Sequence, residues 1–180
     1  MRPPHAAAFP VGSLRLPRDV ESDPRHEDVR RALTVRTKKL WPGGAFDAAV
    51  VPLTEALRKV LQSPATAALL QRGLEAATAT LAAEQRGLAA LPPEVTDRQG
   101  HRVSRVLLVS NDGAERFYRQ VERLAVMHAP RVLVCVLDCD SPALGELLYG
   151  FGGASDGVVK LVLTGHKTAA ASILRALAGH

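Results

Sequence analysis

Apolar and polar positions change their spacing part-way along the chain, and the change separates two kinds of secondary structure. The second part contains three short, almost continuous apolar runs, which are typical of parallel strands buried on both faces. These runs are 105–109, 131–137 and 158–163, and helical patterns follow them at 114–128, 142–149 and 168–177. Strand and helix therefore alternate three times, which predicts right-handed crossovers and a parallel sheet.

The first part follows the spacing of helices instead. Asp23-Pro24 and Ser63-Pro64 each place a capping residue before a proline, a pattern typical of a helix start. We expect helices from these pairs to about Leu40 and about residue 91, with another ending near Gln62. The segment 46–51 is either the approach to that middle helix or a short strand.

Together these patterns divide the chain into four parts. They are a flexible basic arm at 1–22, a helical region at 23–91, a linker at 92–103 and a parallel α/β unit at 104–180. The expected fold class is α/β, with a parallel sheet of three strands or slightly more in the order βαβαβα, as in half of a flavodoxin-like fold. Because three strands make a narrow sheet, we expect the helical region to pack on it.

The composition is that of a folded globular chain, with 47% hydrophobic and 23% charged residues. No apolar run approaches the roughly 20 residues that cross a bilayer, and the first residues lack the apolar stretch of a secretory signal. We therefore expect a cytoplasmic protein without membrane contact. Cys135 and Cys139 are the only cysteines, and we expect both to be reduced thiols.

Positive charge is concentrated near the start of the chain. Residues 1–40 hold nine Lys and Arg against five Asp and Glu, which accounts for four of the net five positive charges. Such a segment can bind nucleic acid through counterion release, or it can simply be solvated. The nucleic-acid candidates are Arg30, Arg31, Arg36, Lys38 and Lys39.

Polar residues follow all three predicted strands. Carboxyl ends of parallel strands meet at one edge, where loops and helix starts bind ligands. The ligand-binding candidates are Asn111, Asp112, Gly113, Asp138, Cys139, Asp140, Thr164, Gly165, His166 and Lys167. Asp112, Asp138 and Asp140 are the ligands expected if Mg²⁺ binds, with Lys167 beside a phosphoryl group. The alternative is that these strand ends only cap helices and form turns, with Asn111 or Asp112 before one helix and Ser141 before another. Capping does not require Asp138, Asp140, His166 and Lys167 as well, which favours a ligand site.

One family resemblance covers the segment 131–166. Its elements are a strand, a loop with Cys139, a helix ending in Leu147-Leu148-Tyr149-Gly150-Phe151, a Gly-Ala-Ser-Asp-Gly-Val segment, and a strand ending in Gly165-His166. This arrangement resembles the iron–sulfur delta subunit of methyl-viologen-reducing hydrogenase and heterodisulfide reductase complexes. That family ligates its cluster with several cysteines, and only Cys139 matches one here. The resemblance therefore implies a degenerate relative that keeps the fold and a docking surface, without an iron–sulfur cluster.

A second resemblance is to response-regulator receiver domains. The segment 105–112 is similar to their first strand with its acidic end, 132–138 to the phosphoacceptor strand, and 163–166 to the strand with the switch threonine. One strand–helix pair and the final strand with its lysine have no counterpart in this chain. This resemblance implies a receiver-like domain, or a small enzyme, that binds a phosphoryl ligand or Mg²⁺.

The sequence contains no complete catalytic motif, and we assign no catalytic residue. We predict a non-catalytic accessory or adaptor subunit of a larger cytoplasmic assembly, with a redox complex as the form that the first resemblance implies. Its partner would be another protein or a second copy of the chain. The alternatives are the phosphoryl-ligand or Mg²⁺ site and nucleic-acid binding through the basic segment.

Overall fold

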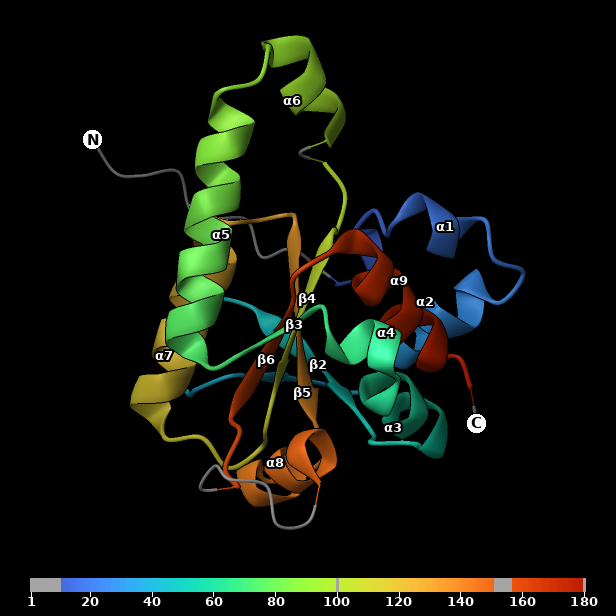
Figure 1. The fold of residues 1–180 in the computed structure, drawn as a ribbon, viewed down its shortest axis with the longest axis vertical. Coiled ribbons are helices and arrows are strands. Elements are labelled where there is room, and N and C mark those ends of the chain that lie inside the picture. Colours follow the sequence, from blue (N-terminus) through green and yellow to red (C-terminus); the bar gives the residue numbers. More distant parts are fainter. Residues whose placement is uncertain (1–10, 100, 151–156, 180) are drawn as a thin grey trace.

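A mixed six-stranded sheet forms the centre of the computed structural model, which describes residues 11–99, 101–150 and 157–179 (Figure 1). The strands are β1 (Thr37–Lys39), β2 (Asp47–Val51), β3 (Leu70–Arg72), β4 (Arg105–Val109), β5 (Val132–Leu137) and β6 (Leu161–Thr164). Across the sheet they lie in the order β1-β2-β5-β4-β6-β3. The α/β class is confirmed, and the sheet has six strands where three or slightly more were predicted.

The strands do not all run the same way. β2, β5 and β4 are parallel neighbours, which confirms the parallel pairing of the first two predicted strands. β6 pairs antiparallel with β4, so the prediction of a purely parallel sheet is wrong at the third predicted strand. The connection explains the reversal, because helix α8 (Ser141–Tyr149) lies beyond the carboxyl ends of β4 and β5 instead of crossing a face (Figure 1). The backbone N–H of Val159 donates to the carbonyl of Ser141, so the chain starts β6 from that same edge.

The region predicted to be helical supplies three of the six strands. Residues 46–51, for which a strand was one of two alternatives, contribute β2. The long helix expected over 64–91 is divided into α4 (Pro64–Ala67), the edge strand β3, and α5 (Leu74–Ala89). Gly73 joins β3 to α5 with a φ of 91°, a conformation that side-chain-bearing residues rarely adopt. The segment expected as a linker contains a further helix, α6 (Pro93–Gln99).

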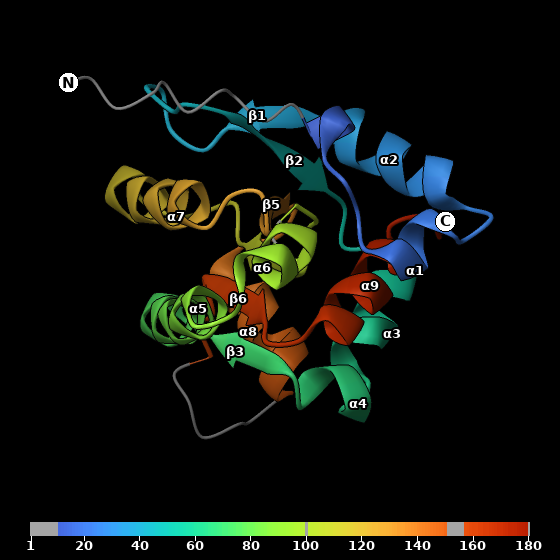
Figure 2. The same ribbon diagram turned by 90° about the horizontal axis from the view of Figure 1, so that it is seen from above.

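Helices cover both faces of the sheet, as Figure 2 shows from above. One face carries α5 and α7 (Glu115–Met127). The other carries α1 (Arg18–Glu21), α2 (His26–Thr34), α3 (Glu55–Gln62), α4 and α9 (Lys167–Ala176). Alternate residues of β4 and β5 enter two separate cores, with Leu108 and Cys135 on the α9 side and Leu107 and Val134 on the α7 side. Burial on both faces explains why β5, and β4 after Arg105, are apolar at every position.

The beginning of the described chain is packed against the body of the protein. Leu16 and Val20 are fully buried, although residues 1–22 were predicted to form a flexible arm. Glu21 accepts a hydrogen bond from the backbone N–H of Leu16 and forms ion pairs with Arg30 and Arg102. Residues 1–10 of the predicted arm lie outside the described residues. In the described ranges, each helix is too short or too polar to cross a membrane.

Candidate functional site

The structure brings together two of the three polar strand ends. Because β4 and β5 are parallel, Asn111 and Asp112 lie beside Asp138, Cys139 and Asp140, and the N–H of Asn111 donates to the carbonyl of Cys139 at 2.9 Å. The third strand end is at the opposite edge of the sheet, because β6 is antiparallel.

Contacts of the third strand end confirm its position. The hydroxyl of Thr164 accepts a hydrogen bond from the N–H of Val106, at the start of β4, at 2.8 Å. Gly165 donates to the carbonyl of Leu69, which precedes β3. His166 and Lys167 therefore do not join Asp112, and the expectation of a common edge is corrected for Thr164, Gly165, His166 and Lys167.

Asp112 holds the loop that leads into α8. Its two carboxylate oxygens accept hydrogen bonds from the backbone N–H and the hydroxyl of Ser141, at 3.0 and 2.7 Å. Burial raises the pKa of Asp112, but these hydrogen bonds outweigh it, so the pKa lies below its ordinary value. Asp112 is thus ionised at neutral pH and bound to groups of its own chain.

Two further candidates, Asp140 and His166, also contact the chain itself. The carboxylate of Asp140 accepts from the N–H of Ala143 and caps α8, while Nδ1 of His166 accepts from the N–H of Thr168 and caps α9. The sequence pattern counted both residues as more than capping requires, and the structure gives each of them a capping role. Within the described ranges, no three His, Cys, Asp or Glu side chains are close enough to hold a metal ion.

Cys139 lies half-buried among the acidic residues of this edge. Burial raises the pKa of its thiol to about 11, and the charges of Asp140, Asp112 and Asp138 act in the same direction against a smaller opposite effect of Arg58. Burial alone raises the pKa of Cys135 to about 12. Both thiols are therefore protonated at neutral pH, the form that is neither nucleophile nor metal ligand.

An open polar depression of about 630 Å³ remains at the carboxyl ends of β2 and β5. It is lined by Val35, Arg36, Thr37, Lys38, Val50, Asn111 and Asp138. Arg36 forms an exposed ion pair of 3.2 Å with Asp138, across 102 positions of sequence. Sequence analysis placed Arg36 and Lys38 in a nucleic-acid surface, and the fold brings them to the strand ends instead.

Three other nucleic-acid candidates contact nearby groups of the chain. Arg30 pairs with Glu21 and donates to the carbonyls of Gly12 and Leu14. Arg31 pairs with Asp28 at 3.0 Å. The ammonium group of Lys39 donates to the carbonyl of Gly44 at 2.9 Å. The basic segment is therefore partly neutralised by its own fold.

Tyr118 is a positioning residue that sequence analysis did not identify. Its hydroxyl donates to the carbonyl of Ser110 at 2.7 Å and accepts from the N–H of Gly113 at 3.0 Å, which fixes the loop between β4 and α7. Burial raises the pKa of Tyr118 above its ordinary value. The sequence feature that could have identified it is a tyrosine on the buried face of the predicted helix, one turn after the polar loop at 110–113.

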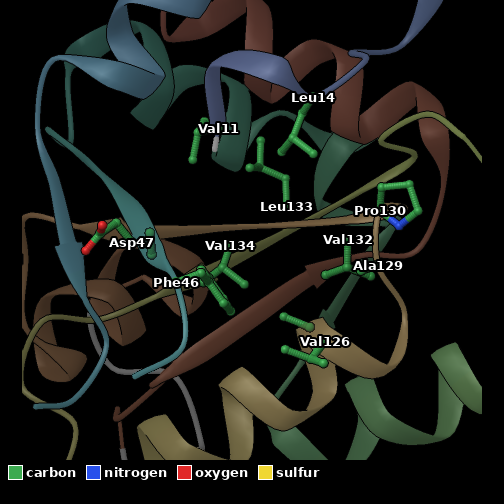
Figure 3. Close-up of a pocket in the computed structure, with 12 residues that line it drawn as sticks. Val11, Leu14, Phe46, Asp47, Val126, Ala129, Pro130, Val132, Leu133 and Val134 are labelled. Atoms are coloured by element: carbon green, nitrogen blue, oxygen red, sulfur yellow. The ribbon is translucent and has the colours of Figure 1, made fainter. Parts of the chain in front are cut away.

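A small apolar cavity lies at the amino ends of β2 and β5, opposite to the polar depression (Figure 3). Val11 and Leu14 line one side of the cavity, and Phe46, Val126 and Pro130 are among the residues that line its other sides. Its volume is about 40 Å³, enough for a few water-sized groups, whereas small-molecule sites measure roughly 300–1,000 Å³. We interpret the cavity as a gap in packing.

A larger groove lies between α5 and α7, on the sheet face that these two helices cover, with a volume of about 470 Å³. Its lining consists of Leu74, Thr78, Ala82, Gln85, Arg86, Gln120, Arg123, Leu124, Met127 and His128. Met127 is 67% exposed, although it is a large apolar side chain. His128 is buried, and its Nδ1 has no hydrogen-bond partner in the described part of the chain.

The electrostatic surroundings of His128 disfavour its charged form. Burial lowers the pKa of this imidazole, the positive charge of Arg131 lowers it further, and Glu84 opposes them. His128 is therefore neutral at pH 7, with one ring nitrogen available for a hydrogen bond.

Comparisons of the chain with protein-family models, with curated proteins and with solved structures each give no match. The resemblances to the hydrogenase delta subunit and to receiver domains accordingly stay predictions. The functional hypotheses below depend on the geometry of the two surfaces, the polar depression and the α5–α7 groove.

Proposed function

We propose that the protein is a non-catalytic accessory or adaptor subunit that binds another protein through the α5–α7 groove. The observation that carries this proposal is the groove itself, which combines apolar residues with exposed polar walls. Leu74 and Ala82 are partly exposed and contribute apolar surface, and Met127 adds an exposed apolar side chain. Apolar surface of this kind, bordered by polar residues, is typical of protein interaction sites.

The packing of α5 supports the same function. This helix has 16 residues, but only Ala77 and Leu81 are buried. A helix normally gains most of its stability in a protein by burying a full apolar face. Further burial of α5 against a partner would supply contacts that the isolated chain lacks.

The carboxyl edge of the sheet supports a non-catalytic role less directly. Asp112 and Asp140 form hydrogen bonds with backbone N–H groups of the loop and helix that follow β5. Both carboxylates thus have a structural role that accounts for their presence. The proposed assembly is cytoplasmic, and a redox complex is the kind that the hydrogenase resemblance favours.

Site-specific photocrosslinking tests the proposal. A photoreactive amino acid is placed at Gln120, in the groove, and in a matched variant at Lys59, an exposed residue of α3 on the opposite face. The full chain is expressed in its own cells, and the adducts are identified by mass spectrometry. We expect one dominant protein adduct from Gln120 and none of that protein from Lys59. A monomer without a specific adduct at either position would refute the proposal.

The polar depression supports a second candidate function, the binding of a phosphorylated small molecule. Arg36, Lys38 and Asn111 supply two cationic groups and an amide at the carboxyl ends of parallel strands, where ligands bind in open α/β sheets. The carboxylate of Asp138 partly offsets this charge.

A thermal-shift screen with inorganic phosphate, nucleotides and sugar phosphates tests this second function. A ligand at 100 times its dissociation constant should add about 2.7 kcal/mol to the free energy of unfolding. The shift should disappear when Arg36 and Lys38 are both replaced by Gln. An unchanged melting temperature with every compound would reject the site.

A further inference from the structure

Two helical stripes line the α5–α7 groove. On α5, Leu74, Thr78 and Ala82 are spaced four residues apart, so they lie along one side of the helix. On α7, Gln120, Leu124 and the neighbouring residues are spaced in the same way. α5 and α7 lie side by side on the sheet in both ribbon views (Figures 1 and 2). Two neighbouring helices with small side chains between them leave a channel that a third helix can fill by ridge-and-groove packing.

The charge of the groove has one sign. Arg86 extends from the α5 wall and Arg123 from the α7 wall, and the residues that line the groove include no carboxylate. Both arginines are exposed, and neither forms an ion pair within the described residues. A ligand in the channel would therefore meet a positive charge on each side.

This arrangement favours one class of occupant over two others. A second copy of the chain, docked by two-fold symmetry, would bring Arg86 and Arg123 into the same interface as their own copies, which is repulsive. Nucleic acid would contact the arginines but would gain little from Leu74, Ala82 and Met127, because its phosphates contact charge rather than apolar surface. An amphipathic helix with acidic flanks satisfies both the apolar floor and the basic walls.

We infer that the α5–α7 groove binds an amphipathic helix of a different protein. Its apolar stripe lies on Leu74, Ala82 and Met127, and its flanking Glu or Asp residues pair with Arg86 and Arg123. This inference rests on the proposed function and specifies the chemistry of the partner.

A displayed library of helical peptides tests the inference with the full chain as bait. The peptides are 16 residues long by design, carry a fixed Leu stripe at helical spacing, and have flanking positions randomised among Glu, Gln and Lys. We expect selection on the natural chain to enrich Glu on both flanks. Selection on a double variant, Arg86→Glu with Arg123→Glu, should enrich Lys at the same positions.

A matched control distinguishes an effect of the two groove arginines from an effect of the protein's net charge on peptide binding. The control combines Arg31→Glu with Lys59→Glu, two exposed positions on the opposite face, and it changes the net charge by the same amount. A selected acidic peptide should bind the control as it binds the natural chain. Its affinity for the groove variant should fall roughly tenfold or more, since opposed charges across an interface are replaced by like charges. Circular dichroism and urea unfolding verify that both variants are folded.

A second variant, Ala82→Trp, tests the floor without changing charge. The larger side chain should fill the channel and abolish binding of the selected peptide. Equal binding by Ala82→Trp and the natural chain would overturn the inference, as would neutral or basic flanks in the selected peptides, no enrichment over an empty bait, or displacement of the peptide by an oligonucleotide.

The two proposals fail in different ways. If the photocrosslinker at Gln120 captures a partner whose contacting segment is not an acidic helix, the adaptor function stands and the inference fails. If no partner is captured and no peptide is enriched, both fail. Dimers seen by light scattering that disappear in the Arg86→Glu, Arg123→Glu variant would replace the inferred partner with a second copy.

Discussion

The carboxyl edge of the sheet and the α5–α7 groove both contain charged side chains, but those at the edge have partners within the described chain and those in the groove do not. At the edge, Asp112 and Asp140 bind donors of the same chain, so their polarity stabilises the fold. In the groove, Arg86 and Arg123 have no acidic partner within the described residues, beside exposed apolar surface. The comparison teaches that residues in a familiar ligand-binding position can be structural, and that free polar groups beside apolar surface are the better sign of an interface.

Among the variants that test this comparison, we expect the largest loss of stability from a substitution of Asp112. Replacing it with Ala should lower the free energy of unfolding by about 1.5–3 kcal/mol. Asp112 is itself exposed, but as a charged group it accepts two hydrogen bonds from the buried Ser141, which would lose its partner. The matched variant Asp138→Ala removes only an exposed ion pair and should cost about 0–1 kcal/mol. Urea unfolding measures both. Equal losses would contradict the structural role assigned to Asp112.

A smaller loss is expected from Tyr118→Phe, which keeps the ring but removes the hydroxyl that joins Ser110 to Gly113. Two hydrogen bonds of the loop are lost, and we expect a decrease of about 1–2 kcal/mol in the free energy of unfolding. Faster hydrogen exchange of the Gly113 amide should accompany it. A stability identical to that of the natural chain would show that the hydroxyl does not hold this loop.

A pH-dependent effect is expected at His128. Its folded pKa is lowered from 6.5 by burial and by Arg131, so below pH 6.5 the unfolded chain binds the proton more readily than the folded chain. The free energy of unfolding should therefore fall as the pH decreases from 7.5 to about 5.5. The variant His128→Gln should have a flatter profile over the same range. The carboxylates Glu21 and Asp112 titrate at lower pH, because their pKa values are also lowered.

The smallest effect on stability is expected in the groove itself. Arg86→Glu with Arg123→Glu should change the free energy of unfolding by less than about 0.5 kcal/mol per substitution, because both side chains are exposed and unpaired within the described structure. Chemical denaturation measures this. A loss of several kcal/mol would mean that the arginines belong to the fold, and the contrast with the carboxyl edge would disappear.

Hydrophobic patterning predicted the centre of the fold but not its full width. β4 and β5 are buried on both faces, and their unbroken apolar runs made them recognisable as parallel neighbours. β6 has the same apolar character, yet it runs the opposite way. Strand direction depends on where the preceding helix lies, and a one-dimensional pattern does not contain that information.

The edge strands were hidden for a different reason. β1 has all three residues exposed, and β3 has only one buried residue, Leu70, so neither shows the alternation of a half-buried strand. β3 also lies between two helices, within a stretch whose apolar spacing suited one long helix. Such short strands form because β2 and β6 provide partners, and those partners are remote in sequence.

The candidate site was predictable only as far as local chemistry decides it. The pair Ser141-Pro142 predicted a helix start with Ser141 as the cap, and the structure moves that role one residue back, to Asp140. The contact of Arg36 with Asp138 joins residues 102 positions apart, and no local rule could anticipate it. The groove depends on Thr78 and Ala82, residues without any distinctive motif, lying opposite α7.

The position of β1 at one end of the sheet has a consequence for solubility. Within the described chain no strand pairs with the free edge of β1, so its backbone N–H and C=O groups face solvent there. Unpaired edges of this kind can pair with strands of other molecules and start aggregation. Lys38 and Lys39 place ammonium groups on this edge, and stacking a second copy against it would bring like charges together. Two residues predicted to attract a polyanion thereby also keep molecules of this protein from adding strands to one another.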